Sequence, residues 1–130
     1  MSLVFDTSIL IDLERKKETT IKGLEDLSKT YPSPAKISFV NEFEFLWGIK
    51  DKNLKNKEKV ISFLNNFVVL HTTSKTSKIL VSLKHKYDKK GLALPLADLL
   101  IASLAIENNG VLVTKDKDFL KIEELKKVIL

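Results

Sequence analysis

Short apolar runs recur along the chain, and longer stretches with helical spacing separate them. Runs of aliphatic, aromatic and β-branched residues bounded by turn residues are typical of strands buried on both faces of a sheet. They predict strands at Ser2–Phe5, Lys36–Ser38, Phe67–Leu70, Val111–Val113 and Val128–Leu130. Apolar residues spaced three and four apart predict helices over residues 8–14, 21–29, 39–50, 57–66, 73–89 and 95–107.

The alternation of strands and helices predicts an α/β fold with three layers, α/β/α, around a central parallel sheet of four to five strands. Ser38 is expected to cap the helix that follows it, and Pro95 to open the helix over residues 95–107 as a first-turn proline. The 130 residues suit one domain, residues 1–130, because no repeat or linker interrupts the pattern.

Composition excludes several classes of site. The chain is 44% hydrophobic and has no cysteine, so disulfides, thiolate metal sites and cysteine nucleophiles are excluded. The N-terminus has no basic segment before Asp6, and the longest apolar stretch is interrupted by Pro95 and Asp98. We therefore expect a cytoplasmic protein without a signal peptide and with no membrane association.

The net charge of +5 comes almost entirely from lysines, since Arg15 is the only arginine. One interpretation is an electrostatic surface that attracts the phosphates of RNA. The other is a lysine-rich solvated surface with no partner. The charge alone leaves both interpretations open.

Asp98 lies one turn into a helix that is apolar on nearly every side, PLADLLIASLAI. Glu107 falls on the opposite face, so if Glu107 faces water, Asp98 faces the interior. An uncompensated buried carboxylate costs several kcal/mol, which implies a partner. The alternative is that Asp98 interacts only with the positive end of the helix dipole.

Two further acids follow predicted strands. Asp6 comes directly after the first strand, and Asp116 follows the strand at Val111–Val113. Ligands of parallel α/β sheets bind beyond the carboxyl ends of the strands, which places both acids at that edge. Alternatively, Asp6 caps the next helix and Asp116 is a turn residue.

The fourth acid lies on the helix SFVNEFEFLWGI. Glu42 and Glu44 point in nearly opposite directions, so only one of them faces inward, and we favour Glu44 because Gly48 leaves room one turn beyond it. The alternative is that Glu42 faces inward. Carboxylates that converge repel one another unless a divalent cation lies among them, and oxygen ligands favour Mg²⁺ or Mn²⁺.

The chain resembles PIN domains, and most closely the VapC-type toxins of toxin–antitoxin pairs. The resemblance rests on VFDTSILID at 4–12, EFLWG at 44–48, LADLLIASLAIENNG at 96–110 and LVTKDKDF at 112–119. It implies an endoribonuclease that hydrolyses RNA phosphodiester bonds with one or two Mg²⁺ or Mn²⁺ ions. It also implies a homodimer and a cognate antitoxin whose tail covers the acidic pocket.

The resemblance also assigns roles to individual residues. The catalytic and metal-binding acids are Asp6, Glu44, Asp98 and Asp116. Polar positions that support the metal, its water or a phosphate are Thr7, Ser8, Thr114 and Asp118, although Asp118 fits equally well as a cap of the short helix after it. The chain departs from the family in having Phe45 where leucine is usual, and in lacking basic RNA-contact residues that could be carried over.

Other functions fit parts of the sequence. A non-catalytic RNA-binding or scaffolding PIN-like module would use the acids only structurally, and a PIN nuclease of RNA processing would share the chemistry without being a toxin. An aspartyl phosphatase would need a second acid where the chain has Ser8. A metal-independent ribonuclease would have to use the two histidines, His71 and His85.

Overall fold

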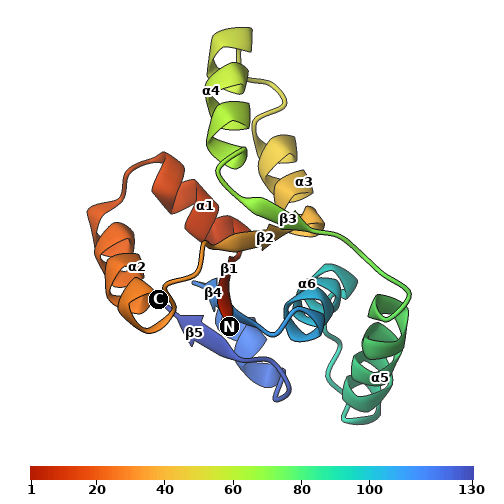
Figure 1. The fold of residues 1–130 in the computed structure, drawn as a ribbon. Helices are drawn as coiled ribbons and strands as arrows, with labels where there is room; N and C mark the ends of the chain where they lie inside the picture. Colours follow the sequence, from red (N-terminus) through yellow and green to blue (C-terminus); the bar gives the residue numbers. More distant parts are fainter.

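A five-stranded, entirely parallel sheet forms the centre of the computed structural model, which describes residues 1–130. Its strands, in the spatial order β3-β2-β1-β4-β5, are β1 Ser2–Phe5, β2 Lys36–Ser38, β3 Val68–Leu70, β4 Gly110–Thr114 and β5 Lys127–Ile129. Helices cover both faces of the sheet (Figure 1), which confirms the predicted α/β/α class.

The helices lie where the apolar spacing predicts them, with ends that shift by a few residues. They are α1 Thr7–Glu14, α2 Glu18–Thr30, α3 Phe39–Gly48, α4 Leu54–Leu64, α5 Thr76–Lys89 and α6 Leu96–Glu107, followed by a 3-10 helix η1 at Lys117–Lys121. Ser38 caps α3 as predicted, since its side chain accepts a hydrogen bond from the Asn41 backbone N–H. Pro95 differs slightly from the prediction, because it occupies the capping position of α6 rather than its first turn. No helix is long and apolar enough to cross a membrane.

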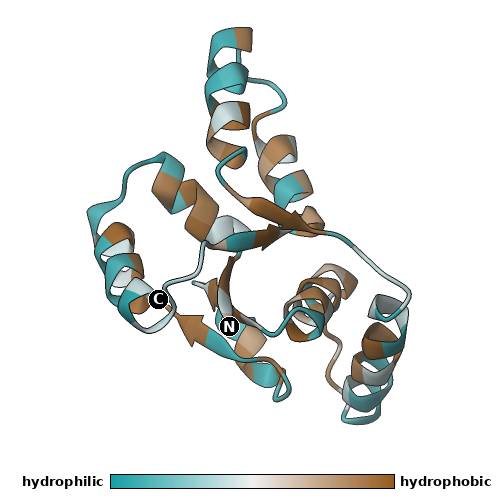
Figure 2. Cartoon of the chain, in the orientation of Figure 1, coloured by the Kyte–Doolittle hydropathy of each residue, from teal (hydrophilic) through white to brown (hydrophobic).

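The strands supply two hydrophobic cores, one on each face of the sheet. Successive side chains of a strand point to opposite faces. Leu3 and Phe5 therefore join the core formed with α1 to α4, whereas Val4 joins the core formed with α5 and α6. Figure 2 shows the apolar strands and α6 in the interior and polar residues on the outward surfaces of the other helices. Burial on both faces explains why the strands are continuous apolar runs.

The strand order decides where the polar residues gather. Because β1 lies between β2 and β4 and all three run parallel, the ends of these strands meet at one edge of the sheet. Asp6 follows β1, the capping residue Ser38 ends β2, and Thr114 ends β4. The fold therefore brings three segments that are far apart in sequence to the same edge.

Candidate active site

Asp6 lies at the centre of this edge and is only 7% exposed. It occupies the capping position of α1, but its side chain makes no capping hydrogen bond. Its carboxylate instead accepts hydrogen bonds from Asn41 Nδ2 at 2.9 Å on Oδ1 and from Thr114 Oγ1 at 2.6 Å on Oδ2. The alternative of a helix cap is therefore wrong for the side chain of Asp6, which faces the site.

Asn41 is the site residue that sequence reasoning missed. Its side chain is fully buried, its Oδ1 accepts a hydrogen bond from Ser38 Oγ at 2.6 Å, and its Nδ2 donates to both Asp6 and Thr7 Oγ1. A signal was present, because Asn41 lies one turn before Glu44 and therefore shares its helix face. The helix α3 thus presents an amide and a carboxylate to the same edge.

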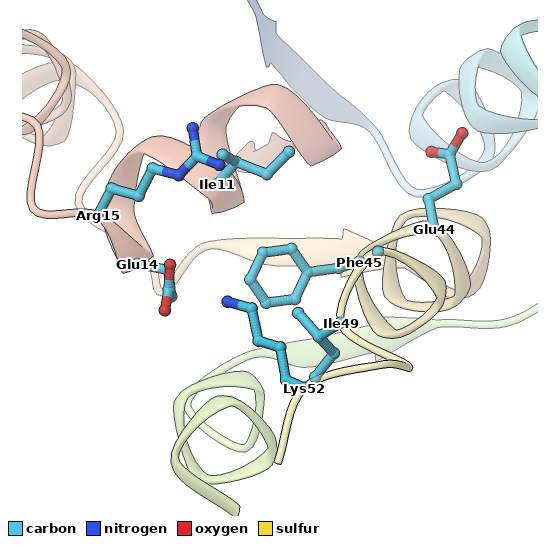
Figure 3. Close-up of a pocket in the computed structure, with 8 residues that line it drawn as sticks. Ile11, Glu14, Arg15, Glu44, Phe45, Ile49 and Lys52 are labelled. Atoms are coloured by element: carbon cyan, nitrogen blue, oxygen red, sulfur yellow. The ribbon is translucent and has the colours of Figure 1, made fainter. Parts of the chain in front are cut away.

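Glu44 and not Glu42 receives the hydrogen bond from α1. Thr7 Oγ1 donates to Glu44 Oε1 at 2.7 Å, and both glutamates are half-buried. Figure 3 shows the Glu44 carboxylate directed away from Arg15 and Lys52, which line a pocket next to it. An added Cβ at Gly48 would meet nothing within 4 Å, so Gly48 opens space beside Glu44 without bringing another element close.

The segment after β4 carries the remaining predicted residues. Thr114 is fully buried and ends the strand, whereas the apolar pattern ended the predicted strand one residue earlier, at Val113. Asp116 is exposed and caps η1, because its Oδ1 accepts a hydrogen bond from the Asp118 backbone N–H at 2.9 Å. The cap predicted at Asp118 is therefore supplied by Asp116, and Asp118 forms an exposed ion pair with Lys121. Ser8 Oγ is 3.5 Å from Asp6 Oδ2, a weak contact.

Asp98 shows the electrostatics of the site. It is half-buried in the first turn of α6, and burial raises its pKa to about 6, helped by the negative charges of Asp116, Asp6 and Glu44, in that order. The other three predicted acids are thus close enough to disfavour ionisation of Asp98.

Glu107, at the other end of α6, does not simply face water. It is half-buried and accepts hydrogen bonds from Thr73 Oγ1 and Thr76 Oγ1 near the start of α5. An inward orientation of Asp98 therefore cannot be derived from Glu107 facing water. The nearness of Asp98 to the other acids rests on their effect on its pKa.

The residues present fit a hard divalent cation by their chemistry. The donors are carboxylate oxygens, and the raised pKa of Asp98 indicates a local excess of negative charge that a cation would relieve. No three acidic or imidazole side chains stand close enough together to form a finished metal cage. Binding of an ion would therefore need side chains to turn inward. Asp116 is exposed, and only its Oδ1 is held, by the Asp118 backbone N–H.

The two histidines lie on other parts of the fold. His71 follows β3 and stacks on Phe39 with 6.2 Å between ring centroids, and His85 is exposed on α5. Ser8, where a phosphatase would carry its second acid, instead accepts a hydrogen bond from the Lys115 backbone N–H.

Comparisons with known proteins show the family to which the chain belongs. The PIN domain family model matches residues 3–125. Ribonuclease VapC2 of Rickettsia felis is 30% identical over 129 residues, which cover 96% of this chain and 95% of the relative. Ribonuclease VapC3 of Methanocaldococcus jannaschii is 31% identical over 104 residues, which cover 80% and 98% of the two chains.

Solved structures give the same result at the level of the fold. VapBC2 from Rickettsia felis bound to a promoter DNA fragment superposes with a TM-score of 0.85 at 26% identity and covers 100% of this chain and 99% of that chain. A toxin–antitoxin complex from Klebsiella pneumoniae gives a TM-score of 0.76 at 26% identity, with 95% of each chain covered.

Proposed function

The chain belongs to the PIN domain family and, within it, to the VapC ribonucleases, and from this premise we propose that it is a metal-dependent endoribonuclease that acts as the toxin of a toxin–antitoxin pair. The observation that carries the proposal is the gathering of acids at one edge of the sheet. There the negative charges of Asp116, Asp6 and Glu44 help to raise the pKa of Asp98. The proposed cofactor is Mg²⁺ or Mn²⁺.

In this proposal each acid has a separate task. Asp6, Asp98 and Asp116 would hold the ion, and Glu44 would bind a second ion through water or orient the attacking water. When bound, such an ion lowers the pKa of a water ligand and neutralises charge on the reacting phosphate.

The neighbouring polar side chains prepare Asp6 and Glu44 for these tasks. Asn41 and Thr114 donate to the two oxygens of Asp6, which fixes the orientation of its carboxylate. Thr7 does the same for one oxygen of Glu44. Both carboxylates are therefore oriented before any ion or substrate arrives.

The proposed partners are an RNA strand, a cognate antitoxin and a second copy of the chain. The net charge of +5 supports attraction of RNA, because lysines contribute charge contacts to phosphates with little selectivity for base sequence. The antitoxin is supported by the solved relatives, which are toxin–antitoxin complexes. The homodimer is inferred from the family alone, and the proposed site of action is the cytoplasm, where the substrate RNA is found.

The test compares the wild type with Asp98→Asn on total cellular RNA in Mn²⁺, with sequencing of the RNA ends. We expect new 5′ ends with the wild type only, and none when a chelator is in excess. Undiminished cleavage by Asp98→Asn, or full activity in chelator, would refute the proposal. RNA binding without turnover by the wild type would support a scaffolding module instead. A small reading frame immediately upstream that encodes a DNA-binding antitoxin would favour a toxin over an RNA-processing nuclease.

A further inference from the structure

Asp12 is a buried acid that the proposed mechanism does not use. It is 7% exposed on α1, and its Oδ2 accepts hydrogen bonds from Thr20 Oγ1 at 2.6 Å and from Lys115 Nζ at 2.9 Å. Thr20 belongs to α2, and Lys115 lies directly after β4. One carboxylate oxygen therefore joins three segments of the chain.

Lys115 is held by α1 at two points. Its side chain pairs with Asp12, and its backbone N–H donates to Ser8 Oγ at 3.1 Å. Ser8 and Asp12 are four residues apart, so they lie on the same face of α1. A single helix face thus fixes both the backbone and the side chain of Lys115.

Lys115 lies between two residues of the acidic site. Thr114 Oγ1 donates to Asp6 and accepts a hydrogen bond from the Asp116 backbone N–H at 3.0 Å. Asp116 is the most exposed of the four proposed ligands, and its carboxylate is positioned by the backbone that these contacts anchor. The anchor at Lys115 therefore determines where the chain leaves the sheet just before Asp116.

We propose that Asp12 and Lys115 are positioning residues, whose ion pair holds the backbone of Asp116 where its carboxylate reaches the metal. The proposal rests on the metal-dependent function proposed above. Asp12 is buried whereas Lys115 is partly exposed, and an ion pair of this kind adds little net stability. A positional role therefore explains its presence better than a stabilising role. The pair also holds the Lys115 ammonium against Asp12 on α1.

The experiment measures Mn²⁺ binding to the full chain without RNA, by the electron paramagnetic resonance signal of free Mn²⁺. The variants are Asp12→Asn, Lys115→Met and the double variant, with Lys115→Arg as the conservative replacement. We expect each single charge removal to weaken Mn²⁺ affinity about tenfold, as for groups that orient metal ligands. The double variant should be no weaker than either single variant, because both remove the same contact, and Lys115→Arg should retain most of the affinity.

Lys86→Met is the matched control. The Lys86 side chain has the same 35% exposure as that of Lys115 and pairs with Glu123 and Glu124, but these residues lie on α5 and after η1, outside the acidic site. It should retain the wild-type affinity for Mn²⁺.

The outcomes separate the two proposals. If the wild type binds Mn²⁺ and cleaves RNA while Asp12→Asn and Lys115→Met keep its affinity and lose only thermal stability, the pair is merely structural and this inference is overturned. If the wild type itself neither binds Mn²⁺ nor cleaves RNA, the proposed function is wrong, and the inference that rests on it is wrong as well.

Discussion

Asp98 makes the electrostatics of the metal-free site measurable. Its pKa rises from 3.8 to about 6 on folding. The largest cause is burial, and the next is the negative charge of Asp116. Between these pH values the folded protein binds more protons than the unfolded chain, so the free energy of unfolding falls as pH rises through this window. Above about pH 6 this contribution is constant.

The variant Asp98→Asn removes that titration. Relative to the wild type in chelator, its free energy of unfolding should increase between pH 3.8 and about 6, by about 1 kcal/mol, since solvent screens a half-buried carboxylate. Urea unfolding at several pH values measures the difference. Saturating Mn²⁺ should restabilise the wild type above pH 6 but not the variant. Parallel stability curves for the two proteins would contradict the raised pKa.

Glu44 and Glu42 provide a comparison on one helix. Because Glu44 is oriented by Thr7 beside the other acids, Glu44→Gln should lower RNA cleavage at saturating Mn²⁺ by at least about tenfold. Glu42→Gln, a change of the same type two residues away, should leave the rate within about twofold of the wild type, as expected for a side chain outside the reacting groups. Single-turnover cleavage rates measure both. Equal losses in the two variants would mean that the wrong glutamate has been chosen.

Whether a site residue could be predicted from the sequence depends on how far along the chain its partner lies. Asp6, Asp98 and Asp116 could be proposed from the sequence because each stands out from an apolar strand or helix next to it. Asn41 offered only its place one turn before Glu44, and Lys115 offered no signal, because their partners Asp6 and Asp12 are 35 and 103 residues away. A polar residue whose partner is remote looks like an ordinary polar residue until the fold is known.

At the scale of elements, β1 and β4 pair closely at Gly110. A Cβ added there would lie 2.6 Å from Val4 Cγ2, and the register pairs Gly110 with Ser2. Gly110→Ala should therefore lower the free energy of unfolding by about 1–3 kcal/mol, because the core side chain or the strand has to move. Gly48→Ala is the control, since its Cβ would meet nothing within 4 Å. Gly48 is the last residue of α3, so the variant should keep the wild-type stability or gain less than the ~0.5–1 kcal/mol of a mid-helix position. Urea unfolding of both variants tests this. A neutral Gly110→Ala would mean that β4 has more freedom against β1 than the register implies.

The elements themselves were predictable because hydrophobic periodicity reflects burial on the sheet or helix. The exception at the site is Thr114, because the predicted strand ended before it, at Val113. In the structure it continues β4, where it is paired with Ile129 of β5 and its hydroxyl is satisfied by Asp6. A polar side chain can be buried at the end of a strand when it has a hydrogen-bond partner there. The partner of Thr114 is Asp6, which is far away in the sequence.

For the whole molecule, alternating strands and helices specify the class of fold but not the order of its strands. The order β3-β2-β1-β4-β5 places β1 in the middle of the sheet, so that residues after β1, β2 and β4 meet. The apolar pattern predicted a parallel sheet of four to five strands without an order, because which strands pair depends on contacts between distant segments. The distances between the four acidic side chains could not be predicted from the sequence, because they depend on side-chain rotamers as well as on the strand order.

Individual lysines can be tested to decide whether the net positive charge attracts RNA or only forms a solvated surface with no partner. Lys52 lines the pocket next to Glu44, together with Arg15, whereas Lys84 is occupied by Asp88 at 2.7 Å on α5. On the inactive Asp98→Asn background, Lys52→Gln should weaken binding of single-stranded RNA and reduce the slope of log affinity against log salt by about 0.7, one phosphate contact. Lys84→Gln removes the same charge and should change neither quantity. Fluorescence anisotropy at several salt concentrations measures both. Identical effects of the two lysines would indicate a diffuse cationic surface and no RNA path beside the acidic site.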